Sequence, residues 1–147
     1  MPDSFTSRLY AETRTINASA ETVYAALTDF AAYPQWNPWI VAVQGEPSEG
    51  SAVIATNNEG KVYHHRILDA ERPKRFRWCD VGWFTRFAYG ERARSIEPID
   101  DTHCHYRCEL SISGPLCLLA HWLYGRGIQT GMQTEADALQ LRCQQSS

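Results

Sequence analysis

The sequence predicts an α+β domain: a twisted antiparallel sheet of about seven strands, two short helices after the first strand and a long C-terminal helix. Three observations indicate this. Strand-like runs separated by short turn-forming segments fill residues 39–113, which favours an antiparallel sheet. Residues 16–39 read INASAETVYAALTDFAAYPQWNPW and join a helix cap to a turn rich in proline and aromatic residues. From Pro115 to Cys143 the pattern is helical.

Size and composition restrict the class of protein. The 147 residues, 44% hydrophobic and 21% charged, match one globular domain spanning residues 1–147. A net charge of −3, with arginines scattered among acids, gives no basic surface, so we expect no nucleic-acid partner. No apolar run approaches the roughly 20 residues of a transmembrane segment, and the first residues lack the pattern of a secretory signal. The expected location is therefore cytoplasmic.

The first strand and the two short helices follow from local signals. Residues 10–16 alternate between polar and apolar side chains, as in a strand. Ser19 can accept the free backbone N–H groups of a helix over 20–28. A second short helical piece is expected at about 29–35, and Pro34 prevents the two from forming one continuous helix.

Six further strands complete the predicted sheet, at 39–45, 51–57, 61–70, 74–80, 85–97 and 102–113. Side chains alternate between the two faces of a strand, so the apolar set of each run should face the core. In two of these runs the predicted inward residues are Phe76, Trp78, Cys104, Tyr106, Cys108, Leu110 and Ile112. The run 61–70 leaves two faces open, one with Tyr63, His65 and Ile67, the other with Val62, His64, Arg66 and Leu68.

The run 85–97 is ambiguous because Gly90 can host a bulge that reverses which side chains face inward. Before it, Phe87 and Tyr89 are expected to face in. In one register after it, Arg92 and Arg94 face in, where an arginine would orient a carboxylate, phenolate or keto oxygen of a ligand. In the other register both arginines are solvated, and the inward residues are Glu91, Ala93 and Ser95.

The C-terminal helix is the element expected to cover the apolar face of the sheet. At 100° per residue its inward stripe has Trp122 at the margin and comprises Leu118, His121, Gly125, Ile128, Met132, Ala136, Leu139 and Cys143. Gly125, Gly127 and Gly131 interrupt the helix, which indicates either a bend or a close approach near 125–127, or only a weak spot.

The pattern I-x-A-S-x-E-x-V-Y-x-x-L-T-D-F-x-x-Y-P-x-W-N-P resembles the opening of the START-like helix-grip superfamily (SRPBCC), which includes polyketide cyclase/dehydrase and lipid-transport proteins. The resemblance extends from about Leu9 to Cys143. Later landmarks that agree with it are Phe76-Arg77-Trp78, Gly90-Glu91-Arg92, Ile96-Glu97-Pro98, Asp101-Thr102 and Ser113-Gly114. It implies a sheet wrapped around the C-terminal helix and enclosing a cavity. Matching the family's inward position to Ile67 selects the face with Tyr63 and His65.

The function that the resemblance implies is binding of a hydrophobic or aromatic small molecule, of lipid, polyketide or isoprenoid type, in the cavity between sheet and helix. It implies no cofactor and identifies no protein partner. The residues expected to form the ligand-binding cavity are Trp36, Trp39, Tyr63, His65, Phe76, Trp78, Phe87, Tyr89, Arg92, Arg94, Tyr106, Cys108, Leu110, His121, Trp122, Ile128 and Met132.

Two other functions stay open. A cyclase or dehydratase would use the same cavity, but the sequence shows no Ser-His-Asp, Cys-His or metal-binding triad. The weak acid/base candidates are His65, Glu91, Tyr106 and His121. A protein-interaction domain would use the outer sheet face, which carries the polar residues His103, His105, Arg107 and Glu109. Solvated histidines are expected there, and no metal site.

Overall fold

The seven predicted strands form a single antiparallel sheet in the computed structural model, which describes residues 7–146, in the order β1-β7-β6-β5-β4-β3-β2. The strands are β1 (Ser7–Ile16), β2 (Ile40–Gly45), β3 (Ala52–Asn57), β4 (Val62–Glu71), β5 (Arg75–Asp80), β6 (Tyr89–Asp100) and β7 (His103–Ser113). The helices are α1 (Ala20–Thr28), η1 (Phe30–Ala32), α2 (Tyr33–Trp36), η2 (Trp83–Arg86) and α3 (Cys117–Ser146). The predicted α+β class and helix-grip architecture are confirmed.

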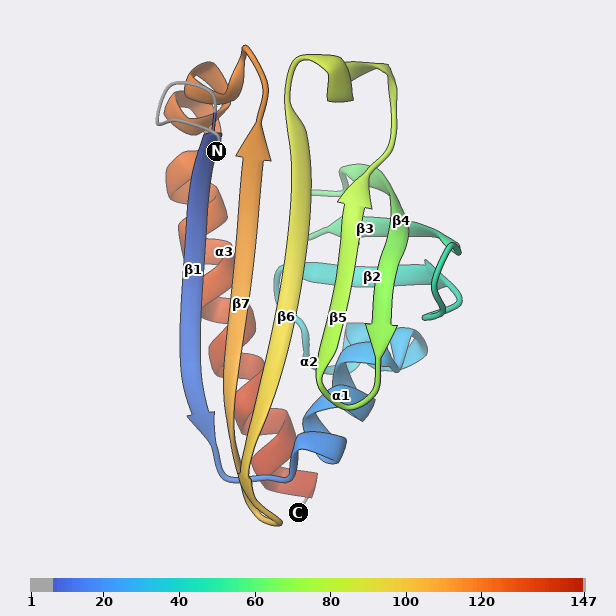
Figure 1. Ribbon diagram of the computed structural model, residues 1–147, viewed down its shortest axis with the longest axis vertical. Coiled ribbons are helices and arrows are strands. Elements are labelled where there is room, and N and C mark those ends of the chain that lie inside the picture. Colours follow the sequence, from blue (N-terminus) through green and yellow to red (C-terminus); the bar gives the residue numbers. More distant parts are fainter. Residues whose placement is uncertain (1–6, 147) are drawn as a thin grey trace.

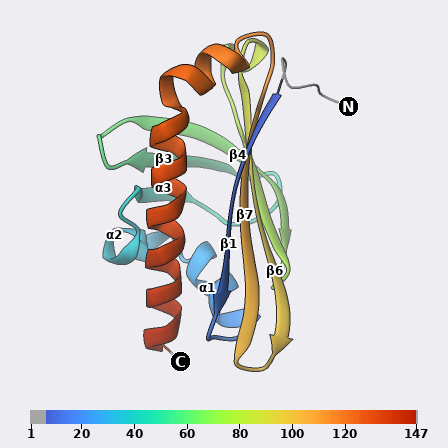
Figure 2. The same cartoon turned by 90° about the vertical axis from the view of Figure 1, so that its left-hand side faces the viewer.

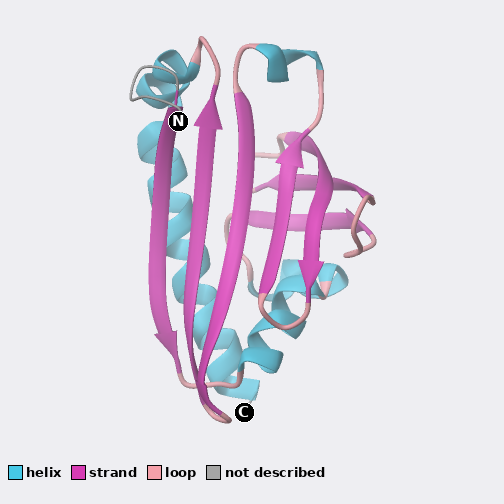
Figure 3. Cartoon of the chain, in the orientation of Figure 1, coloured by secondary structure: helices cyan, strands magenta, loops and turns pink. Residues whose placement is uncertain are grey.

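The sheet twists strongly, so its two ends lie at a steep angle to each other. In Figure 1 the strands β1, β7 and β6 run side by side along the long axis, whereas β2 and β3 run across the view behind β5 and β4. Figure 3 shows that the helices gather on one side of this sheet. In the turned view of Figure 2, α3 runs next to the strands over most of its length. A sheet twisted in this way partly surrounds the helix and leaves room between them.

Side-chain contacts attach α3 to the first strand. The Gln140 side-chain amide donates a hydrogen bond to the Thr15 carbonyl at 2.8 Å, and the Asn17 amide donates to Gln144 at 3.1 Å. Arg14 forms an ion pair with Asp137 at 2.9 Å. These contacts fix the C-terminal half of α3 over one edge of the sheet.

The segment between β1 and β2 folds as its capping signals predict. Ser19 accepts a hydrogen bond from the Thr22 amide at 3.1 Å and begins α1. The second helical piece is divided into η1 and α2, with Pro34 in the first turn of α2. Asn37 ends α2, and the chain then turns into β2.

Aromatic rings fill the core below α1 and η1. The Phe30 ring meets the Phe76 ring edge-on at a centroid distance of 6.0 Å and the Trp78 ring at 6.4 Å. Tyr106 and Met132 are buried in the same core. All five cysteines are buried, and none of them forms a disulfide within the described residues. The predicted inward faces of β5 and β7 are therefore the observed ones.

The register of β6 settles the question that Gly90 left open. Its pairing with β7 runs without a break from Tyr89 opposite Ser113 to Pro98 opposite Cys104, and the irregularity lies between Pro98 and Asp100. There is no bulge at Gly90, because alternation is continuous there. Arg92 and Arg94 are buried, so the register with Glu91, Ala93 and Ser95 facing inward is wrong.

The expected inward orientation of Phe87 and Tyr89 is also wrong. Phe87 follows the short helix η2, where a strand was expected, and is 43% exposed. Tyr89 alternates with the buried Gly90 and so lies on the outer face, where its hydroxyl donates to Glu91 at 3.4 Å. Tyr89 faces outward because β6 alternates through Gly90 without a bulge, and Phe87 is exposed because η2 replaces the start of the predicted strand.

The first turns of α3 incline away from the axis of the rest, as Figure 2 shows in orange. Met132, Ala136, Leu139 and Cys143 are buried, as the helical periodicity predicts. The same periodicity is wrong for three residues of the first turns, because Leu118, His121 and Trp122 are exposed. A straight projection fails there because the helix bends.

Candidate functional site: a cavity between the sheet and α3

A cavity of about 1150 Å³ lies between the inner face of the sheet, the turn after α2 and the middle of α3. Seven of the expected ligand-binding residues line it, namely Trp39, Tyr63, His65, Trp78, Arg92, Leu110 and Ile128. Five others are buried in the core but do not line it: Phe76, Arg94, Tyr106, Cys108 and Met132. The remaining five, Trp36, Phe87, Tyr89, His121 and Trp122, lie partly or largely exposed and outside it.

The strand register arranges the cavity wall in rows. On the inner face, Trp78 of β5 lies opposite Arg92 of β6, which in turn lies opposite Leu110 of β7. One row away, His65 of β4 lies opposite Asp80 of β5. Side chains of two adjacent rows therefore project from the sheet into one space.

Arg92 is a buried charged group of the cavity wall, only 7% exposed, and the charged residues Glu59, Lys61, Asp80 and Arg126 also line the cavity. Its guanidinium lies over the Trp39 ring, with the central carbon 4.4 Å from the ring centre. Nη1 is 3.8 Å from the Glu135 carboxylate, and Nε and Nη1 form no hydrogen bond within the described residues. A buried guanidinium with unused N–H donors is costly unless an acceptor is supplied. Arg92 can therefore receive an oxygen atom of a bound molecule.

Arg94 sits two residues further along the same strand face and forms a close ion pair, with only its Nε lacking a hydrogen bond within the described residues. Its Nη2 lies 2.6 Å from Oε1 of Glu135, and both residues are 1% exposed. The Asn37 amide donates to the other Glu135 oxygen at 2.9 Å. Burial acts to raise the pKa of Glu135, but Arg94 and Arg92 outweigh it and the pKa falls below its ordinary value. This network joins β6, α3 and the turn after α2.

Sequence reasoning did not identify Glu135 or Asn37. A signal for Glu135 exists, because it lies one turn from both Met132 and Leu139 on the buried face of α3. A carboxylate on an apolar helix face indicates a cationic partner on the element opposite. Asn37 gives a weaker signal, since its side-chain oxygen also accepts from the Trp39 and Ile40 amides, as many turn residues do.

His65 and Asp80 form a second polar pair on the cavity wall. Nδ1 of His65 lies 3.1 Å from Oδ1 of Asp80. The imidazole ring stacks on Trp78 at a centroid distance of 4.8 Å, with only 4° between the planes. Gly90 makes room for the carboxylate, because a Cβ there would lie 2.4 Å from Oδ2 of Asp80. The indole face restricts the imidazole ring, whereas Nδ1 of His65 makes no hydrogen bond within the described residues.

Of the other acid/base candidates, none reaches the cavity. Glu91 lies on the outer face and binds Arg77 at 2.7 Å. His121 is exposed, and its Nδ1 is 2.5 Å from the Tyr10 hydroxyl. Tyr106 is buried beside the cavity, where burial raises the pKa of its hydroxyl well above the ordinary value. His65 is thus the acid/base candidate that lines the cavity.

Trp39 connects the cavity to α3. A Cβ at Gly131 would lie 2.2 Å from the Trp39 indole, so only glycine permits this ring to lie against the helix. The ring in turn supports the Arg92 guanidinium from below. Gly131, which the sequence marks as an interruption of the helix, is therefore also the residue that makes room for the Trp39 ring.

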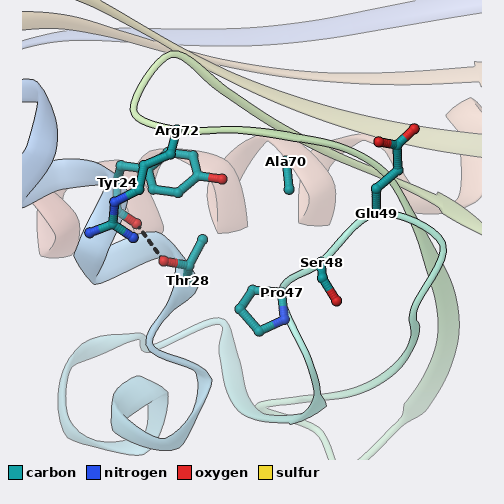
Figure 4. A pocket seen from close by; sticks show the side chains of 7 residues that line it. All are labelled: Tyr24, Thr28, Pro47, Ser48, Glu49, Ala70 and Arg72. Atoms are coloured by element: carbon teal, nitrogen blue, oxygen red, sulfur yellow. Dashed lines mark hydrogen bonds between the residues drawn. The ribbon is translucent and has the colours of Figure 1, made fainter.

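A smaller pocket of about 270 Å³ lies between α1 and the β2–β3 turn (Figure 4). Arg72 covers the Tyr24 ring there, and the Thr28 hydroxyl donates to the Tyr24 carbonyl at 2.9 Å. No expected site residue lies in this pocket. In residues 7–146, no group of three or more His, Cys, Asp or Glu side chains is placed to hold a metal ion. Within the same residues, no helix is long and apolar enough to span a membrane.

Solved structures share the fold over almost the whole chain. A START superfamily protein from Mycobacterium smegmatis is 22% identical, with a TM-score of 0.71, covering 95% of this chain and 99% of that chain. The ZhuI aromatase/cyclase from a Streptomyces species is 14% identical, with a TM-score of 0.76 and 94% coverage of both chains. Norcoclaurine synthase from Thalictrum flavum, in complex with dopamine and hydroxybenzaldehyde, is 12% identical, with a TM-score of 0.72, covering 96% of this chain and 88% of that chain.

No curated protein matches the sequence. The family described as "Polyketide cyclase / dehydrase and lipid transport" matches residues 9–142, which is nearly the full length. With the helix-grip fold and the cavity between sheet and helix, this match identifies the chain as a member of the polyketide cyclase/dehydrase and lipid-transport family.

Proposed function

We propose that this protein binds a hydrophobic or aromatic small molecule of lipid or polyketide type in the cavity between the sheet and α3. The observation that carries the proposal is a space of about 1150 Å³ with aromatic walls and a buried arginine that has unused donors. The ligand we infer has an apolar body and at least one carbonyl, phenolate or carboxylate oxygen that contacts Arg92.

The size of the cavity suits this class of ligand. Small-molecule sites commonly have volumes of about 300–1,000 Å³, with mainly apolar walls and a few polar groups that fix orientation. Trp39, Trp78 and Leu110 supply the apolar wall, and Arg92 supplies the polar contact. Charge-assisted hydrogen bonds to an arginine are strong and directional, so Arg92 would decide which end of the ligand lies deepest.

The related structures support a ligand of this kind. The family description includes polyketide chemistry and lipid transport, and one structure of the same fold holds dopamine and hydroxybenzaldehyde. Another is an aromatase/cyclase. We transfer from these proteins only the class of molecule, an apolar or aromatic compound with oxygen substituents.

The first test is native mass spectrometry of freshly purified protein, followed by extraction and identification of any released compound. We expect a stoichiometric apolar or aromatic compound that contains oxygen. A protein that is empty as purified and also takes up no apolar probe would contradict the proposal.

The second test places uptake in the cavity. Leu110→Trp adds a large ring to the cavity wall, and Leu141→Trp makes the same change at an exposed position of α3 outside the cavity. With the fluorescent probe anilinonaphthalene sulfonate, we expect Leu110→Trp to weaken binding by tenfold or more and Leu141→Trp to leave it unchanged. Equal binding by both variants would show that the probe binds elsewhere.

A further inference from the structure

We propose that the end of the molecule where η2 meets the first turns of α3 docks on the surface of a lipid bilayer that carries anionic headgroups. The docking does not depend on what the cavity holds. The contact is peripheral, because no helix within residues 7–146 is long and apolar enough to span a membrane.

The connection between β5 and β6 supplies the first half of this surface. Its large apolar side chains are exposed, namely Val81, Trp83, Phe84 and Phe87, and Trp83 is 79% exposed. The Trp83 ring meets the Phe84 and Phe87 rings edge-on, at centroid distances of 6.4 and 6.3 Å. These rings therefore pack on one another at the surface and not in the core.

The first turns of α3 supply the second half. Residues 116–124 are apolar or aromatic except for His121, so the helix has no polar face there. A helix segment that is apolar on all sides is normally buried. Most of this one is exposed, namely Leu116, Leu118, Leu119, Trp122, Leu123 and Tyr124. Nothing within the described residues covers these side chains, so the segment has the composition of a buried helix without the cover.

The two halves form one surface, which we call the apolar end. The Leu116 amide donates a hydrogen bond to the Phe87 carbonyl at 2.9 Å. A Cβ at Gly114 would lie 2.5 Å from that carbonyl oxygen, and the φ of Gly114 is +117°, so this close approach requires glycine. Figure 1 shows η2 and the start of α3 at the same end of the molecule, opposite the C-terminus. Extended apolar patches mark sites of protein or membrane contact.

The charge of the apolar end favours a membrane with anionic lipids. Arg86 is exposed in the first half, and Arg126 is exposed directly after the second. Neither residues 81–90 nor residues 111–134 contain an acid, although the whole chain has a net charge of −3. Basic side chains are attracted to anionic headgroups, and tryptophan and tyrosine favour the headgroup level of a bilayer.

The acids that border the apolar end do not cancel this charge. Asp80 lies beside His65 in the cavity wall, and Glu91 binds Arg77 on the outer face of the sheet. Glu59 is 3.6 Å from Lys61, whose ammonium lies over the Tyr124 ring. That pair is neutral as a whole, so the apolar end keeps the positive charge of the two arginines.

A second copy of the chain fits this surface less well. A symmetric dimer places the same patch of both copies face to face. Arg86 and Arg126 of one copy would then meet the same basic surface of the other, and neither segment contains an acid to pair with them. A bilayer with anionic lipids supplies both an apolar interior and a negative surface.

The apolar end is continuous with the cavity. Phe84, Leu123 and Tyr124 belong to the apolar end and also line the cavity. An apolar molecule can therefore pass between the bilayer and the cavity along apolar side chains. This use of the docking surface rests on the proposed binding function, whereas the docking does not.

The test is flotation of the purified protein with vesicles on a density gradient. We expect the wild-type protein to float with vesicles of equal parts phosphatidylcholine and phosphatidylglycerol. Rising salt should weaken this binding, because it screens the attraction between the arginines and the headgroups. Vesicles of phosphatidylcholine alone should bind the protein more weakly.

Two matched pairs of variants locate the contact. Leu119 and Leu141 are exposed leucines on α3, 48% and 59% exposed, but Leu141 lies near the C-terminal end of the helix. Leu119→Ser should lower the vesicle partition coefficient by about tenfold, since burial of a leucine side chain contributes at least that factor. Leu141→Ser should leave it unchanged. On anionic vesicles Arg86→Gln should lower it about fivefold, whereas Arg72→Gln, in the β4–β5 turn, should not.

Three results would overturn the docking surface, provided that circular dichroism shows every variant to be folded. The first is a wild-type protein that does not float with anionic vesicles. The second is an equal loss of binding in Leu119→Ser and Leu141→Ser. The third is a dimer in analytical ultracentrifugation that Leu119→Ser dissociates, without vesicle binding, since a second copy would then cover the apolar end.

Leu110→Trp distinguishes docking from the binding function. This variant fills part of the cavity and leaves the apolar end unchanged, so it should float as the wild-type protein does. Loss of flotation in Leu110→Trp would mean that the cavity captures lipid without a docking surface. That result would overturn this inference and leave the binding function intact. Flotation of a wild-type protein that takes up no apolar probe would contradict the binding function alone.

Discussion

Arg92 and Arg94 lie on the same face of the same strand, two residues apart, and have opposite surroundings. Arg94 is paired with Glu135 at 2.6 Å in a packed core. Arg92 is 3.8 Å from the same carboxylate, keeps two unbonded nitrogens and borders the cavity. A single acid on α3 thus forms a close ion pair with one arginine, of which only Nε makes no hydrogen bond within the described residues, and leaves two nitrogens of its neighbour without one. The comparison teaches that the partner on the opposite element, and not the residue type, decides whether a buried guanidinium is paired in the core or keeps unused donors.

The largest effect should come from breaking the structural pair. We expect Arg94→Met to lower the free energy of unfolding by about 3–5 kcal/mol in denaturant titration, because it leaves a buried carboxylate without its main partner. Arg94→Met with Glu135→Gln should recover most of this loss, since the amide is neutral and still accepts from Asn37. A double variant as unstable as the single one would contradict the pairing.

Trp78 lies between the packed core and the cavity, so its removal should affect both. It contacts Phe30 and Phe76 on the core side and stacks on His65 on the cavity side. Trp78→Ala should cost about 3–5 kcal/mol of stability, as large truncations in cores do. Trp83→Ala, at a residue that is 79% exposed, should change stability by less than about 0.5 kcal/mol. Chemical denaturation measures both, and a near-neutral Trp78→Ala would show that this ring is not part of the core.

Arg92 should affect binding more than folding. Loss of a hydrogen bond to a charged group costs about 1.5–3 kcal/mol, which corresponds to roughly a 10- to 100-fold loss of affinity. We therefore expect Arg92→Met to weaken binding of anilinonaphthalene sulfonate by that factor and to destabilise the fold less than Arg94→Met does. The control Arg66→Met removes the same charge from an exposed position on β4. Fluorescence titration that finds equal weakening by both variants would rule out a specific contact.

The smallest expected effect is the acid dependence of stability. Burial raises the pKa of Glu135, but Arg94 and Arg92 lower it more strongly. The pKa therefore lies below the ordinary value of 4.5. The unfolded chain therefore binds this proton at a higher pH than the folded protein, so the stabilisation is complete above about pH 4.5 and is lost as the pH falls. The slope is at most ~1.4 kcal/mol per pH unit. In thermal unfolding, the stability of the double variant Arg94→Met with Glu135→Gln should fall less steeply with decreasing pH than that of the wild type. An equal pH dependence in both proteins would mean that other carboxylates cause it.

Much of the fold was predictable because it depends on local and periodic signals. The cap at Ser19, the turns and the alternation of β5 and β7 place the strands and their inward faces. The site was predictable only in part. Tyr63, His65 and Trp78 line the cavity as expected, but Tyr89 faces outward because β6 continues through Gly90 without a bulge. No local pattern distinguishes a glycine that bends a strand from one that makes room for a neighbour.

The helix shows the limit of periodicity in another way. A projection at 100° per residue assumes a straight axis, and it fails for His121 and Trp122 in the inclined first turns of α3. Glu135 was missed because a charged residue on an apolar stripe makes sense only once the facing strand is known. Pairing between distant elements is a tertiary property, and one sequence carries only a hint of it.

Because Gly131 has no side chain, the packing of α3 against Trp39 helps to set the position of Arg92 on the sheet. Because Trp39 lies against the bare backbone of α3 and supports the Arg92 guanidinium, a single added methyl group would act as a wedge between helix and turn. It would move the Trp39 indole and, with it, the Arg92 guanidinium that the indole supports. The position of the Arg92 guanidinium in the cavity wall therefore depends on α3 as well as on the sheet.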